Sequence, residues 1–208
     1  TADDKTQALF DNCFQLLNGP DAPDLFVEEL ENELILILEN KVISNNYNEF
    51  YNEQDPTIIP QPEDSINTPE KEKEFRTYRF QGYKVYQVVD NTVGANDLDD
   101  VSKARLINQV DIKDSVSRLI NFYFDADLGV SVPKMEVDGR NEGISKSFKI
   151  TQDVFAEGDN KLVNNKAYYF MALAYAYNGN DKEWPYLGSR KGTTGAIKPV
   201  KGIPHNIS

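Results

Sequence analysis

Residues 162–178 read Leu-Val-Asn-Asn-Lys-Ala-Tyr-Tyr-Phe-Met-Ala-Leu-Ala-Tyr-Ala-Tyr-Asn, and the second half of this stretch alternates between two faces. Tyr168 and Phe170 begin one face, and Tyr169 and Met171 begin the other. A period of two is typical of a β-strand, and aromatic side chains suit a pleated surface. The stretch therefore predicts a long strand in an all-β protein.

Other segments with strand-like patterns surround this one. Strands are expected at residues 25–30, 33–38, 77–89, 117–124, 144–155 and 196–200, and residues 101–109 fit either a short helix or an irregular strand. Gly82 interrupts one of these segments, so we expect a bulge or a close backbone approach there. Several strands separated by turn-rich segments favour an antiparallel sandwich.

The remaining segments are expected to be a helix, long loops and a tail. Residues 1–17 have helical spacing of apolar residues, and Gly19 and Pro20 would end that helix. Residues 39–74 are acidic and rich in proline, and residues 125–143 read as another long loop. We therefore expect a helical segment at 1–20, one domain at 21–200 with insertions at about 40–75 and 91–143, and a tail at 201–208.

Three segments resemble fibronectin type III domains. They are the proline-flanked entry at residues 21–25, the Gly-Tyr-Lys-Val-Tyr sequence at 82–86, and the spacing of Leu162 to Tyr168. The resemblance implies a fibronectin type III-like β-sandwich whose fold is carried by Tyr83, Val85, Leu162, Tyr168 and Phe170. It also implies that the Tyr168 hydroxyl bonds to nearby backbone. The chain departs from the family at residues 34–38, where an apolar run replaces the usual tryptophan of the second strand.

Several phrases also resemble segments of large secreted proteins of Bacteroidota, such as type IX secretion cargo or gliding-surface proteins. They are residues 18–24, 78–86, 162–169 and 174–178. This resemblance implies an extracellular or outer-membrane surface location within a larger parent chain. Its partners would be neighbouring domains of that parent or other surface proteins.

The charge balance and the apolar runs exclude some classes of partner. Acidic residues outnumber basic ones by 34 to 22, which gives a net charge of −12. Such a surface repels phosphate backbones, so we expect no nucleic-acid partner. No apolar run approaches the ~20 residues of a membrane-spanning helix, so we expect no membrane insertion.

The sequence offers no credible catalytic site, and we expect a noncatalytic protein. Its only histidine, His205, lies in the tail, and its only cysteine, Cys13, lies near the start of the chain. A nucleophile needs a base within hydrogen-bond reach, which would require the two termini to meet. A hydrolase that uses paired carboxylates is a further alternative, but no spacing indicates such a pair.

Clustered aspartates make calcium the best inorganic candidate in the sequence. The candidate ligands are Asp97, Asp99 and Asp100 in one loop and Asp125 and Asp127 in another. Calcium prefers clustered oxygen ligands, whereas solvated acidic loops explain the same pattern without an ion. No other cofactor is expected.

Exposed loop aromatics suggest a second class of function, a carbohydrate-binding accessory module with a polysaccharide partner. Trp184 and Tyr186 are the candidate stacking pair, although loop aromatics also pack onto the fold or form protein interfaces. In addition, Ser65 and Ser115 lie in Asp-Ser-apolar triplets that resemble the O-glycosylation motif of Bacteroidota. The first expectation remains a structural or protein-interaction module of a larger secreted or surface-attached protein.

Overall fold

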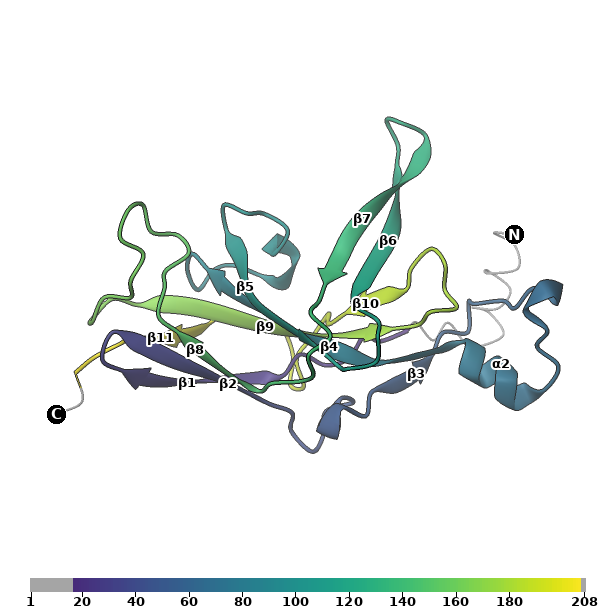
Figure 1. Ribbon diagram of the computed structural model, residues 1–208, viewed down its shortest axis with the longest axis horizontal. Helices are drawn as coiled ribbons and strands as arrows, with labels where there is room; N and C mark the ends of the chain where they lie inside the picture. The colour runs from purple at the N-terminus through teal and green to yellow at the C-terminus, as the bar shows by residue number, and fades with distance from the viewer. Residues whose placement is uncertain (1–16, 207–208) are drawn as a thin grey trace.

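The computed structural model describes residues 17–206 and consists mostly of antiparallel β-structure, which confirms the all-β prediction (Figure 1). The smaller sheet has the order β1-β2-β8, formed by β1 (Asp24–Leu30), β2 (Glu33–Glu39) and β8 (Ser147–Ile150). The larger sheet has the order β10-β9-β4-β3, with β5 added on β4 and β11 added on β9. Its strands are β3 (Asn52–Gln54), β4 (Thr77–Val88), β5 (Ala104–Asp111), β9 (Tyr168–Tyr177), β10 (Tyr186–Gly188) and β11 (Val200–Gly202).

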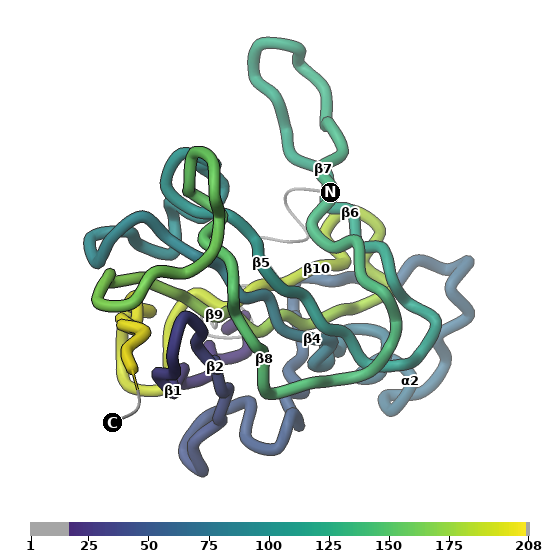
Figure 2. Tube along the Cα trace, turned by 60° about the vertical axis from the view of Figure 1, so that its left-hand side comes forward, coloured from purple at the N-terminus to yellow at the C-terminus, as the bar shows by residue number. Residues whose placement is uncertain are grey.

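Two further strands, β6 (Arg118–Asp125) and β7 (Val130–Asp138), pair only with each other in the described part of the chain. This hairpin projects well beyond the body of the molecule (Figure 2). The helical elements are short: η1 (Tyr47–Glu49), η2 (Pro62–Asp64), α2 (Pro69–Phe75) and η3 (Ala95–Asp97). Within residues 17–206, no helix is long and apolar enough to cross a membrane.

One apolar core joins the two sheets. Leu34 and Leu36 of β2 and Phe148 of β8 belong to the same buried cluster as Val85 of β4 and Phe170 of β9. In β2 the buried residues alternate with partly exposed ones, as in a strand with one buried face, whereas β4 and β9 are buried on both faces. The two sheets therefore pack face to face. The other face of the larger sheet is covered by a second apolar cluster that includes Met171 and Leu173, and by the base of the β6–β7 hairpin, where Leu119 packs on Tyr175.

The long pair β4–β9 forms the centre of the larger sheet, and its register shifts between Phe80 and Gly82. A Cβ atom at Gly82 would lie 2.1 Å from the Val110 carbonyl oxygen and 2.5 Å from the Tyr175 hydroxyl. Glycine is therefore required where three strands approach this closely. The predicted bulge or close approach at Gly82 is confirmed.

The prediction of a loop at residues 125–143 is wrong, because β7 occupies its centre. Pro133 argued against a strand, since proline cannot donate to a ladder. The Phe122 backbone N–H donates outside the hairpin, to Glu183, so the Phe122–Pro133 pair is a non-hydrogen-bonded one. The Pro133 nitrogen then faces the free edge of β7, where its missing donor removes no bond within the hairpin.

Smaller differences concern strand ends. The strand expected at 144–155 covers only Ser147–Ile150, because the chain then turns at Asp153, whose carboxylate accepts the Phe155 backbone N–H. The last strand is Val200–Gly202 rather than 196–200, so the expected tail at 201–208 begins two residues too early. Residues 101–109 resolve into strand β5, and strand β10 was not predicted.

The acidic segment at 40–75 contains β3 and the short helix α2 rather than a continuous loop. Thr68 caps this helix by accepting the Lys71 backbone N–H, and Pro69 occupies its first turn. The helix expected at residues 1–17 lies almost wholly outside the described residues.

Candidate functional site

The β6–β7 hairpin is the most conspicuous surface feature of the described chain (Figure 2). Its turn is well defined, because one Asp125 carboxylate oxygen accepts the backbone N–H groups of Asp127 at 2.9 Å and Leu128 at 3.0 Å. Gly129 completes the turn with a φ of 66°, which glycine adopts without strain. The tip of the hairpin is therefore an ordered turn, stabilised by the Asp125 carboxylate and by the positive φ of Gly129.

One face of this hairpin is apolar and exposed, and we call it the outer apolar face. It consists of Ile120, Phe122, Phe124, Pro133 and Met135. These residues share a face because Phe122 pairs with Pro133 and Ile120 with Met135 in the ladder. Phe124 is 71% exposed, Met135 50% and Phe122 38%. Large apolar side chains gathered on one exposed face are typical of a protein-binding surface.

The opposite face of the hairpin is bonded to the larger sheet at its base. Lys84 of β4 is buried, with its Nζ atom 4.0 Å from Glu136 of β7 and 4.5 Å from the centre of the Tyr186 ring. The Tyr123 hydroxyl donates to Glu136 at 2.6 Å, and Lys134 lies 3.3 Å from the same carboxylate. Burial lowers the pKa of Lys84 to about 8, against the attraction of Glu136.

A second set of contacts joins β6 to the segment around β10. The Asn121 side chain both donates to the Tyr186 carbonyl oxygen and accepts the Tyr186 backbone N–H, each at 3.0 Å. Asn121 itself is buried. These paired bonds act like one rung of a sheet ladder, so the base of the hairpin is held in a fixed orientation while its outer apolar face remains open.

The five side chains expected to carry the fold are all buried: Tyr83, Val85, Leu162, Tyr168 and Phe170. The Tyr168 hydroxyl accepts the Val163 backbone N–H at 2.9 Å. The Tyr83 hydroxyl accepts from the Asn40 amide at 2.6 Å and donates to Glu49 at 3.1 Å. Burial raises the pKa of Tyr83 far above its ordinary value. These residues serve packing and loop attachment rather than an open site.

The structure does not form the predicted stacking pair of Trp184 and Tyr186. Tyr186 lies in β10, packed against Tyr175 with ring centres 5.5 Å apart, and burial raises its pKa well above the ordinary value. Trp184 is 42% exposed, but its ring packs edge-on against Tyr123 at 4.7 Å. The loop was expected to expose both rings, whereas β10 pairing turns Tyr186 under the hairpin.

The predicted calcium ligands Asp97, Asp99, Asp100, Asp125 and Asp127 do not converge, and residues 17–206 contain no acidic or histidine cluster suited to a metal ion. Asp97 pairs with Lys103 at 2.5 Å, and Asp99 pairs with Lys134 at 2.7 Å. The Asp100 carboxylate accepts the backbone N–H two residues further along. The closeness of these aspartates in the sequence suggested that they bind one ion together. In the structure their carboxylates instead form ion pairs or accept backbone N–H groups within turns.

The two candidate O-glycosylation sites lie in exposed turns. Ser65 has a φ of 55° and Ser115 a φ of 75°, both in the left-handed region. Their modification stays a prediction. His205, the only histidine, is exposed, and its Nδ1 atom lies 3.4 Å from a carboxylate oxygen of Glu29. Cys13, the only cysteine, lies outside the described residues.

The sequence predicted the first strand of the hairpin, β6, but not the second. The alternation Phe122-Tyr123-Phe124 predicted a strand, but nothing in it indicated which face would be exposed.

In comparisons with known proteins, the chain matches no family model, and no curated protein or solved structure is significantly similar to it.

Proposed function

We propose that this chain is a noncatalytic protein-interaction module of a larger secreted or surface-attached bacterial protein, with a fibronectin type III-like sandwich as its scaffold. The observation that carries the proposal is the projecting hairpin, held at its base and apolar on its outer face. The location on the cell surface or outside the cell, and the origin in Bacteroidota, rest on the sequence phrases alone.

Two features support the fibronectin type III-like assignment. In immunoglobulin-like sandwiches the first, second and fifth strands form one sheet, and the third, sixth and seventh form the other, to which an extra strand is often added. The division of β1, β2 and β8 from β4, β5, β9 and β10 has this form once the β6–β7 hairpin is treated as an insertion. The bond from the Val163 N–H to the Tyr168 hydroxyl has the form of a tyrosine corner.

The hairpin would present its side chains rather than its backbone edge to a partner. Pro133 lies in the middle of the free edge of β7 and lacks a donor, so it hinders the addition of a further strand. Phe122, Phe124 and Met135 then supply the contact. Rigid aromatic anchors lose little conformational entropy on binding, which makes them efficient interface residues.

Charge indicates what kind of partner fits. The chain carries a net charge of −12, and Asp125 and Asp127 flank the hairpin tip. Two copies would repel each other, whereas a partner with an apolar patch and a basic rim would be attracted. We therefore propose a protein of that chemistry, or a neighbouring domain of the parent chain, as the occupant.

A capture experiment tests this proposal. The immobilised chain is exposed to envelope proteins of the producing cells, alongside a Phe122→Ser/Phe124→Ser variant and a Val42→Ser/Ile43→Ser control. Val42 and Ile43 are each 75% exposed and lie outside the hairpin. We expect a specific protein to be retained by the wild type and the control and lost by the hairpin variant. Equal retention by all three would contradict the proposal.

A further inference from the structure

A cleft of about 560 Å³ lies at the end of the larger sheet, and no residue of the outer apolar face lines it. It is bordered by the segment entering β3, by the end of α2, and by the loops that follow β5 and β9. This volume falls within the range of ligand-binding sites in proteins, about 300–1,000 Å³. Neither the predicted stacking pair nor any predicted calcium ligand lines it.

Three neighbouring strands supply a row of side chains to this cleft. Asn52 of β3 pairs with Arg79 of β4, and Arg79 pairs with Tyr177 of β9, so all three lie side by side on one face. An amide, a guanidinium and a phenol are thereby aligned on rigid strands. The amide and the phenol can both donate hydrogen bonds to hydroxyl groups and accept them, and the guanidinium can donate.

The charges around this row are largely balanced by internal contacts. Arg79 lies 2.5 Å from Glu74, and the Gln81 amide donates to both oxygens of Asp114 at 3.1 Å. Glu49 pairs with Lys146 at 2.8 Å. A phosphate or a carboxylate would face these acidic groups, and an acyl chain would remove the paired charges from water without adding a polar contact. The lining therefore suits a neutral ligand rich in hydroxyl groups.

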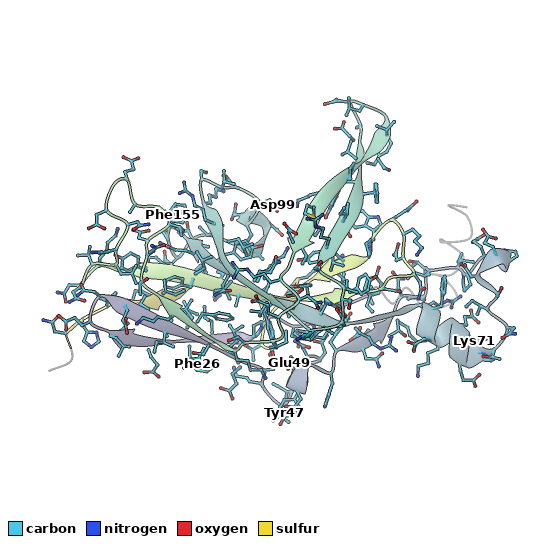
Figure 3. All side chains as sticks on the ribbon, viewed as in Figure 1. Phe26, Tyr47, Glu49, Lys71, Asp99 and Phe155 are labelled. Atoms are coloured by element: carbon cyan, nitrogen blue, oxygen red, sulfur yellow. The ribbon has the colours of Figure 1, made fainter. Side chains whose placement is uncertain are left out.

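The rim of the cleft carries an exposed ring, Phe50, which is 78% accessible. The two preceding residues, Asn48 and Glu49, have φ values of 54° and 63°, which non-glycine residues seldom adopt. The Glu49 carboxylate is held by the Tyr83 hydroxyl and by Lys146, and Figure 3 shows Glu49 beside Tyr47 at the underside of the molecule. The core thus fixes a strained loop that sets Phe50 at the edge of the cleft.

We propose that this cleft binds a neutral oligosaccharide, with Asn52, Arg79 and Asp114 contacting sugar hydroxyls and the Phe50 ring covering an apolar C–H face. The site differs from the loop at Trp184, and it stands apart from the protein-binding role of the hairpin. Either proposal can fail without the other.

Isothermal titration calorimetry with purified protein tests the site against cellohexaose, maltohexaose, laminarihexaose, xylohexaose and mannohexaose at millimolar concentrations. We expect at least one of them to bind with one-to-one stoichiometry. Phe50→Ala and Asn52→Ala should each weaken that binding by about tenfold or more. Both side chains are exposed, so these variants should fold, which circular dichroism verifies.

Ile43→Ala is the matched control, because Ile43 is an exposed apolar residue of the same loop that does not line the cleft. It should bind like the wild type. Three results would overturn the proposal: no binding of any hexasaccharide, unchanged binding by Phe50→Ala and Asn52→Ala, or loss of binding by Trp184→Ala instead.

Discussion

Replacing Lys84 by methionine tests how the hairpin is held on the sheet. Lys84 is buried between β4 and β7, and methionine fills similar space without a charge. Glu136 would keep its contacts with Tyr123 and Lys134, so the substitution leaves no carboxylate without a partner. The effect should therefore be read in the pH dependence of stability rather than in a loss of folding.

The magnitude follows from the pKa of Lys84, which burial lowers from 10.5 to about 8. Between these values the unfolded chain binds more protons than the folded one, so stability rises with pH. At pH 7 the lysine is charged in both states and this gain is absent. At about pH 9.5 the gain amounts to ~2 kcal/mol, and the methionine variant lacks it.

Urea unfolding of both proteins at neutral pH and near pH 9.5 measures this difference. Burial raises the pKa values of Tyr175 and Tyr186, which lowers stability at alkaline pH, but this affects both proteins and cancels in the comparison. Lys71→Met is the control, because Lys71 is exposed on α2 (Figure 3). A pH-independent difference between the wild type and Lys84→Met would refute the reasoning.

Three further predictions concern the scaffold. Tyr168→Phe should lower the free energy of unfolding by about 1–2 kcal/mol, because a backbone N–H loses its acceptor, whereas Tyr169→Phe should change it by less than about 0.5 kcal/mol. Equal values for these two variants in urea unfolding would contradict the corner role. Gly82→Ala should cost about 2–3 kcal/mol, since its Cβ would overlap the Val110 carbonyl oxygen, while Gly94→Ala, with 3.5 Å to its nearest neighbour, should be nearly neutral. Calcium and a chelator should give the same melting temperature, and a clear rise with calcium would restore the ion site that the aspartates suggested.

Strand periodicity predicted the centre of the fold well. Residues 77–89 and 168–177 became β4 and β9, because long alternating runs leave little choice of structure. Gly82 was identified for the same reason, since glycine within a strand is otherwise unfavourable. The alternation of residues along the sequence was sufficient to predict these strands, because their side chains are buried in the core.

Elements on the periphery were harder to predict. Thr68 and Pro69 are typical of the start of a helix. However, α2 buries no residues, so its sequence lacks the apolar periodicity that predicts a helix. Pro133 led to the prediction of a loop in place of β7. Only the pairing of Pro133 with Phe122 shows that the proline nitrogen faces the free edge of the hairpin. Both elements depend on capping or edge position rather than on burial.

The site depended on tertiary placement that spacing does not encode. Tyr186 looked like an exposed loop aromatic until β10 pairing buried it beneath the hairpin. Asn52, Arg79 and Tyr177 come from three distant segments, and only the strand register aligns them. Sequence could suggest aromatic and polar recognition, but not which residues would meet.

Site-specific photo-crosslinking in the producing cells tests the interaction role of the hairpin most directly. A benzophenone derivative of phenylalanine would replace Phe124 or, as a control of the same chemistry, Phe26. Phe26 is 48% exposed on β1, on the side of the molecule opposite the hairpin (Figure 3). We predict one dominant crosslinked protein or domain from position 124 and none in common with position 26. Absence of crosslinks at 124, or the same products from both positions, would contradict the account.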